Sequence, residues 1–121
     1  MSAFLKLHGI MPHVLREGVT ARAVTGERMT LAVIDLEPNA AVPEHKHDNE
    51  QLGFVINGSI TMRVGSEKRE LHAGDTYTIP SNVPHEAAAG SDGATVVDVF
   101  APLRADWASL KREEPSRGNW P

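Results

Sequence analysis

The sequence predicts an all-β fold, a single domain built as a barrel of short antiparallel strands. Proline and glycine interrupt the chain at intervals of about 8–12 residues, which is typical of β-sandwiches and barrels. The runs between them are short and rich in apolar residues. Only residues 104–114 have a helical pattern, because Trp107 and Leu110 are three residues apart and can share a helix face. A length of 121 residues suits one such domain.

The expected strands follow one another along the chain, separated by turn residues. Asn57-Gly58 tolerates positive φ at both positions and therefore predicts a type I′ hairpin. Further turns are expected at Gly65-Ser66 and Gly74-Asp75, and strands joined by tight turns are mostly antiparallel. The expected strands are 19–25, 29–36, 52–56, 59–64, 69–72, 76–79, 85–88 and 95–100.

Three segments make up the predicted organisation of the chain. Residues 19–103 are expected to form the barrel. Residues 1–18 are an N-terminal extension, which forms either an added strand or a loop that pairs with a partner chain. Residues 104–121 are expected to form a short C-terminal helix followed by a tail.

Composition excludes several classes of function. The net charge is −4 and the basic residues are scattered, so no nucleic-acid partner and no membrane partner is expected. The N-terminus lacks the apolar region of a signal peptide, which favours a cytoplasmic protein. The chain has no cysteine, so any metal must be held by His, Asp, Glu or Gln.

A group of polar residues precedes the apolar run that starts near residue 52. Residues two apart on a strand share a face, so His45 and His47 point the same way. Gln51 starts the next apolar run after a short turn at Asp48-Asn49, and His85 begins a later strand. Imidazoles with an oxygen ligand suit Zn, Fe, Ni, Cu or Mn. The alternative is that these are surface histidines in a polar loop, which is common for a His-x-His pair taken alone.

A second group lies in the apolar run at 95–101. Asp98 and Phe100 share one face of the expected strand, and Arg104 follows just past its end. An Asp in such a run is costly unless it is paired or solvated. It is therefore either an edge or structural ion-pair residue, or an acid inside the barrel beside the metal. Arg104 would then lie at the barrel mouth, where its guanidinium could grip a substrate carboxylate. Tyr77 is expected to contribute packing.

These residues resemble the two conserved motifs of the cupin superfamily. In the first motif Asn39 takes the initial glycine position and Gln51 takes the glutamate position. In the second, Asn82 replaces a glycine, which is tolerated because Asn also adopts the left-handed conformation. The matching positions are Asn39, His45, His47, Gln51 and Gly58, then Gly74, Pro80, Asn82 and His85. The resemblance implies a jelly-roll barrel (a double-stranded β-helix), usually a homodimer. It also implies one divalent transition metal, Ni, Zn, Fe or Mn, held by His45, His47, Gln51 and His85.

The segment after the second motif resembles one branch of small cupins, that of the pectin-degradation protein KdgF. The matching residues are Asp98, Val99, Phe100, Pro102, Arg104 and Asp106. The resemblance implies ring opening and ketonisation of 4,5-unsaturated monouronates, with Asp98, Phe100 and Arg104 as catalytic or substrate-contacting residues. Two alternatives stay open. One is a metal-dependent dioxygenase of a small organic acid, and the other is a non-catalytic cupin that binds a small molecule.

Overall fold

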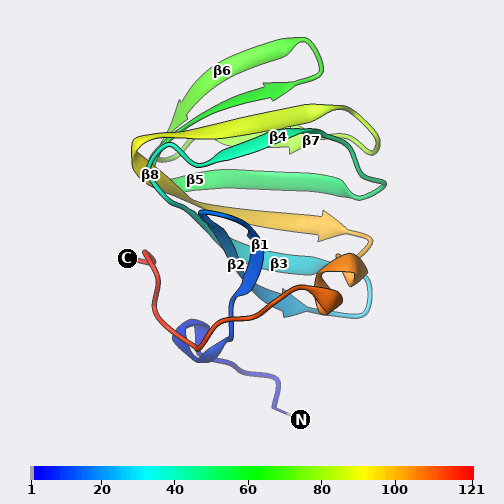
Figure 1. The fold of residues 1–121 in the computed structure, drawn as a ribbon. Coiled ribbons are helices and arrows are strands. Elements are labelled where there is room, and N and C mark those ends of the chain that lie inside the picture. Colours follow the sequence, from blue (N-terminus) through cyan, green and yellow to red (C-terminus); the bar gives the residue numbers. More distant parts are fainter. Residues whose placement is uncertain (1) are drawn as a thin grey trace.

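The computed structural model describes residues 2–121, and almost all of its regular structure is strand. Figure 1 shows the strands wrapped around a common interior, with both termini on the same side of the barrel. The all-β, single-domain prediction is confirmed. The elements are η1 (Leu7–Gly9), β1 (His13–Arg16), β2 (Val19–Thr25), β3 (Thr30–Leu36), β4 (Ala41–His45), β5 (Glu50–Val64), β6 (Glu67–His72), β7 (Thr76–Ile79), β8 (His85–Ala101) and η2 (Ala105–Ser109).

Two long strands, β5 and β8, connect both halves of the barrel. They pair antiparallel with each other from Glu50↔Ala101 to Val64↔His85. Around residues 51–57 of β5, the sheet continues through β7 on one side and through β8, β3, β2 and β1 on the other. Around residues 59–64, β5 pairs with β6, and the facing part of β8 pairs with β4. Each long strand therefore carries residues into both sheets.

The hairpin expected at Asn57-Gly58 is wrong. Strand β5 continues through both residues, which pair with Thr95 and Ala94 across register shifts. Gly58 does adopt the positive φ (75°) that the sequence indicated, but it does so in an irregular strand. The position also needs glycine for space, because a Cβ there would overlap the carbonyl oxygen of Gly93. The turns at Gly65-Ser66 and Gly74-Asp75 lie between β5 and β6 and between β6 and β7, as predicted.

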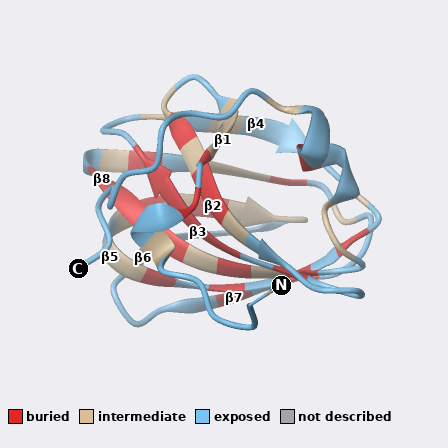
Figure 2. Cartoon of the chain, turned by 90° about the horizontal axis from the view of Figure 1, so that it is seen from below, coloured by how far each residue is buried: buried red, intermediate tan, exposed pale blue. Residues whose placement is uncertain are grey.

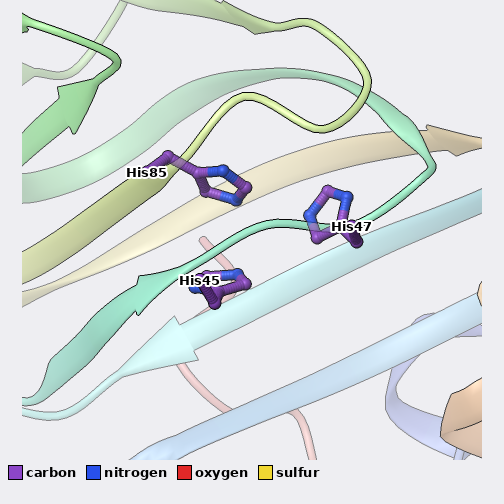
Figure 3. A group of neighbouring side chains, drawn as sticks. All are labelled: His45, His47 and His85. Carbon is purple, nitrogen blue, oxygen red and sulfur yellow. The ribbon is translucent and has the colours of Figure 1, made fainter.

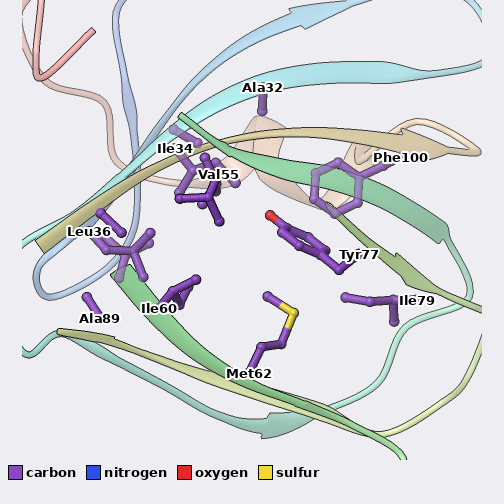
Figure 4. Packing of buried hydrophobic residues seen from close by; sticks show 14 of the residues in the cluster. Ala32, Ile34, Leu36, Val55, Ile60, Met62, Tyr77, Ile79, Ala89 and Phe100 are labelled. Carbon is purple, nitrogen blue, oxygen red and sulfur yellow. The ribbon is translucent and has the colours of Figure 1, made fainter. Parts of the chain in front are cut away.

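The hydrophobic core fills the barrel interior. Alternation along β7 buries Tyr77 and Ile79 and leaves Thr76 and Thr78 exposed. The buried side chains of several strands meet around the same interior (Figure 4), whereas β4 and the tail are mostly exposed (Figure 2). The core includes Val19, Ala21, Ala32, Ile34, Leu36, Val55, Ile60, Met62, Tyr77, Ile79, Val96, Phe100 and Trp107.

The two chain ends pack against each other beside the barrel. Strand β1 pairs with β2 of its own chain, and His13 forms a bridge with Arg112. The helix expected over 104–114 is only the 3-10 segment η2, whose i+3 hydrogen bonds suit the spacing of Trp107 and Leu110. Beyond it the chain is extended, because residues 111–113 bond to the β1 segment. Within residues 2–121, no helix has the length and apolar character needed to cross a bilayer.

The C-terminal tail crosses the outer face of β2 and β3. Arg22 is 3% exposed and pairs with Asp35, its Nη1 lying 3.0 Å from Asp35 Oδ2. The guanidinium also donates to the carbonyl oxygen of Ser116 (2.7 Å), and the backbone N–H of Asn119 donates to Asp35 (3.2 Å). A buried ion pair is stabilising only when its remaining polar atoms are bonded, and the tail supplies these partners.

Candidate metal centre

Three imidazoles from two adjacent segments meet at one end of the barrel. His45 ends β4, His47 follows it in the loop, and His85 begins β8, where it pairs directly with His45. One ring nitrogen of each lies within 4.8 Å of those of the others. Figure 3 shows the three rings directed toward a common centre. The structure therefore brings together the three histidines that the sequence singled out.

Backbone carbonyls fix which nitrogen of each ring carries the proton. The Nδ1 atoms of His45, His47 and His85 lie 2.9, 3.0 and 2.9 Å from the carbonyl oxygens of Pro43, Asn49 and Val83. A carbonyl oxygen can only accept, so each Nδ1 donates and each neutral ring keeps its lone pair on Nε2. This is the protonation state that a metal-ligating imidazole requires.

The metal-free arrangement leaves this lone pair of His85 unsatisfied. Its Nε2 is buried and has no hydrogen-bond partner among the described residues. Such an orphaned polar atom is costly unless a ligand, water or ion completes it. Burial, then the neighbouring imidazoles and Arg104, hold the pKa of His85 below its usual value despite the bond to Val83. The donor set of three neutral imidazoles fits a divalent transition metal.

Gln51 extends this donor set from β5. It is buried, and its Oε1 lies 3.1 Å from Nε2 of His47. Its Nε2 donates to Asp98 Oδ2 at 3.0 Å, which identifies the oxygen as the end that faces the histidines. Two acceptors thus face each other, an arrangement that needs a cation or an added proton. Burial and the charge of Arg104 lower the pKa of His47, which disfavours the proton.

Asp98 lies in the same interior, between Gln51 and Tyr77. It is 3% exposed, and burial raises its pKa to about 7 against the opposing effects of its hydrogen bonds and of Arg104. Tyr77 donates its hydroxyl to Asp98 Oδ1 in a short bond, and burial raises the pKa of this phenol. The sequence interpretation missed Tyr77. The only available signal was that alternation places it on the face that also carries Ile79.

Phe100 and Arg104 stand on the other side of the histidines. The Phe100 ring is 6.0 Å from that of His47, and the Arg104 guanidinium lies 4.9 Å from the centre of Phe100 and 4.8 Å from that of Trp107. Its Nε and Nη2 donate to both carboxylate oxygens of Asp106 at 3.1 and 3.0 Å. The bidentate grip that the sequence suggested for a substrate is therefore already made with Asp106. Nη1 is in no hydrogen bond within the described chain.

A cavity of about 360 Å³ connects these groups. Its lining includes His45, His85, Gln51, Asp98 and Arg104 together with further charged side chains, and apolar side chains form the rest. This volume is within the range of small-molecule sites. The sequence model of the cupin domain family matches residues 32–100, which is more than half of the chain. The chain belongs to the cupin family.

One sequence comparison relates this cupin to a KdgF protein, and one structural comparison shows a shared fold. It is 30% identical over 95 residues to the pectin degradation protein KdgF of Dickeya dadantii, covering 77% of this chain and 86% of that protein. The structure of KdgF from Halomonas superposes with a TM-score of 0.80 at 24% identity, covering 88% and 98% of the two chains. At 24% identity this second comparison shows a shared fold and nothing more specific.

A third cupin is larger. Oxalate decarboxylase of Bacillus subtilis, which has Mn(II) centres, superposes with a TM-score of 0.75 at 23% identity. The match covers 89% of this chain but only 31% of that one. At this identity the comparison shows the shared fold alone.

Proposed function

We propose that this cupin is a metal-dependent enzyme acting on a small carboxylated substrate, and that its reaction is the ring opening and ketonisation of 4,5-unsaturated monouronates. The observation that carries the proposal is the convergence of three imidazole lone pairs and the Gln51 oxygen beside a buried acid in one cavity. The similarity to the pectin degradation protein of Dickeya dadantii supports the substrate class.

The proposed ligands are His45, His47, Gln51 and His85. All four are neutral, so a bound divalent ion would keep its full charge, attract the substrate carboxylate and stabilise negative charge on the adjacent enol oxygen. The positive Arg104 also favours an anion in the cavity. Because its fork is bound to Asp106, its contribution to the substrate is through Nη1 and its charge, which differs from the bidentate grip inferred from the sequence.

Asp98 is proposed as the acid–base group of the reaction. Its carboxylate takes the proton of the anomeric hydroxyl as the bond between the anomeric carbon and the ring oxygen breaks. The aldehyde forms at the anomeric carbon, and the released electron pair leaves an enolate at C5. Asp98 then returns the proton to C4, which gives the 5-ketone. Phe100 forms a wall of the cavity and excludes water from the sugar ring.

The direct test is to follow the loss of an unsaturated monouronate by NMR. The metal-loaded wild-type protein should convert it faster than the spontaneous reaction, and the metal-free protein should not. A wild-type rate equal to the spontaneous one would remove this substrate class. Metal analysis and oxygen uptake then separate the alternatives, because a dioxygenase of a small organic acid consumes oxygen and a binding module turns over nothing.

The proposed assembly is a homodimer formed through the outer face of the larger sheet. Cross-strand pairing places Val24, Leu31, Val99 and Leu52 in one row, and Phe54 lies in the next row. Four of these five are between 41% and 48% exposed, a contiguous apolar surface of the kind found at interfaces. A two-fold interface sets a surface against itself, and the row of Val24, Leu31, Val99 and Leu52 has no charge that would oppose this by repulsion.

Light scattering on variants tests this assembly. Leu52→Asp should convert dimers to monomers, because it buries two like charges across the two-fold axis. Leu5→Asp changes an exposed leucine of the N-terminal extension, where it should leave the dimer intact. If Leu5→Asp dissociates the dimer and Leu52→Asp does not, the extension is the interface, as the alternative for residues 1–18 supposes. A monomeric wild type excludes both.

A further inference from the structure

The Gln51 amide has an orientation that is unfavourable among the protein groups alone, because its oxygen faces the lone pair of His47 Nε2. Rotating the amide by 180° would let its Nε2 donate to the lone pair on His47 Nε2, a hydrogen bond the observed orientation lacks. The same rotation would set Oε1 against the Asp98 carboxylate, where Nε2 now donates at 3.0 Å. The acceptor at Asp98 is therefore what holds the amide oxygen toward the histidines.

Asp98 can do this only if its own carboxylate is held in place. Its two oxygens accept from two different donors, Oδ1 from the Tyr77 hydroxyl and Oδ2 from Gln51. One donor lies on β5, which pairs with the Asp98 segment of β8, and the other lies on β7, on the far side of β5; Tyr77 is only 9% exposed. Figure 4 shows the Tyr77 hydroxyl pointing into the barrel interior from the β7 side.

The local backbone leaves room for this contact at one position. Gly53 pairs with Asp98 on one side and with Tyr77 on the other. A Cβ on Gly53 would overlap Asp98 Oδ1 and would lie 2.5 Å from Cε1 and Cζ of Tyr77. Any larger residue at 53 must therefore displace the phenol or the carboxylate. Three strands that are neighbours in the sheet, β7, β5 and β8, thus leave the space that the hydrogen bond between Tyr77 and Asp98 needs.

We propose that Tyr77 is a positioning residue of the metal centre. Through Asp98 it selects the orientation of the Gln51 amide that presents Oε1 to the ion, and Gly53 provides the space for it. This inference rests on the proposed metal-binding function. It predicts that an oxygen atom far from the histidines controls metal affinity, and that it does so only while Gln51 carries an amide.

The test is a double-mutant cycle on metal affinity, with Co²⁺ and Zn²⁺ as probes. Tyr77→Phe removes the hydroxyl and keeps the ring in the core. Partners that orient metal ligands typically contribute 10–100-fold to affinity, so Tyr77→Phe should weaken binding by about tenfold or more. The visible spectrum of bound Co²⁺ should also shift, because the oxygen donor is no longer held in place. In a Gln51→Leu background, Tyr77→Phe should leave affinity and spectrum unchanged.

The outcomes separate the two proposals. An equal loss of affinity in both backgrounds would mean that Tyr77 acts only through general stability, and no loss in either would mean that it does not act on the centre; each overturns the inference. A wild-type protein that binds neither ion overturns the metal function and the inference with it. Gly53→Ala should weaken Co²⁺ binding like Tyr77→Phe, whereas Gly9→Ala, where nothing lies within 4 Å of the added Cβ, should not.

Discussion

The two halves of the metal centre are built in different ways. The histidine half consists of His45, His47 and His85, and two of these lie on the exposed β4 segment and its loop. The carboxylate half consists of Gln51, Tyr77 and Asp98, all buried on the neighbouring strands β5, β7 and β8. Each histidine is oriented by a backbone carbonyl within two residues of it, whereas each member of the carboxylate half is oriented by side chains of other strands.

This difference indicates a division of labour. Local carbonyls make the histidine half largely independent of packing, so it can supply donors from a loop. The carboxylate half places polar groups where an unpaired one would cost roughly 1–3 kcal/mol, and it depends on every member being satisfied. The histidine half should therefore contribute most to metal affinity, and the carboxylate half should set the orientation of the Gln51 oxygen and the acid–base chemistry.

Removing a histidine should have the largest effect. His85→Ala takes away a neutral donor that no neighbour replaces, so metal retention should fall by more than the roughly 10–100-fold typical of an orienting partner, and turnover should fall to the spontaneous rate. Metal content after dialysis measures this. His72→Ala is the control, because this exposed residue on β6 lies outside the centre. Full metal content in His85→Ala would contradict the ligand assignment.

Asp98→Asn should lower turnover by about 100- to 10,000-fold, the usual contribution of a positioned acid–base group. The variant keeps only one of the two acceptor oxygens, so either Gln51 or Tyr77 loses its acceptor and metal affinity should fall as well. Rates must therefore be compared at saturating metal. Full activity under that condition would leave the metal centre and remove the acid–base role of Asp98.

The stability of the metal-free protein should depend on pH through Asp98. Its folded-state pKa of about 7 is above the ordinary value, so its favourable contribution is complete below about pH 4 and is lost as the pH rises toward 7. Each unit of pKa difference corresponds to about 1.4 kcal/mol. Relative to Asp98→Asn, the metal-free wild type should thus lose a few kcal/mol of unfolding free energy across this window.

Denaturant unfolding at several pH values measures that difference. His47 and His85 have lowered pKa values and act in the opposite direction, but both proteins retain them, so their effect cancels in the comparison. Parallel pH profiles of the two proteins would show that Asp98 does not titrate in this range.

Gln51→Glu should have the smallest effect. It changes the residue through which the carboxylate half contacts the histidine half. It replaces a donor 3.0 Å from Asp98 with a second carboxylate, and two carboxylates this close share a proton. Above the pH at which that proton leaves, the added negative charge should tighten metal retention about tenfold and slow turnover about tenfold. Each tenfold change corresponds to about 1.4 kcal/mol. Metal competition and NMR turnover, measured against pH, test this. Unchanged turnover throughout would count against the electrostatic argument.

The same contrast explains what the sequence could predict. The facing of Gln51 rather than Glu50 follows from strand alternation, which is a local relation, whereas His45, His47 and His85 were brought together by the spacing of the two cupin motifs. The pairing of Tyr77 with Asp98, the space at Gly53 and the capture of Arg104 by Asp106 depend on which strands lie side by side. The continuation of β5 through Asn57-Gly58 was missed for the same reason, since a positive φ fits a bulge as well as a hairpin.

The pairing of β5 with β8 also sets the order in which the site can be assembled during synthesis. His45, His47 and Gln51 leave the ribosome well before His85 and Asp98, and at about 5–20 residues per second the interval is a few seconds. During that interval the emerging chain offers a pair of imidazoles with no opposing strand. Complete coordination therefore waits until β8 has paired with β4 and β5, so a metal ion can report on a late step of folding as well as serve the finished enzyme.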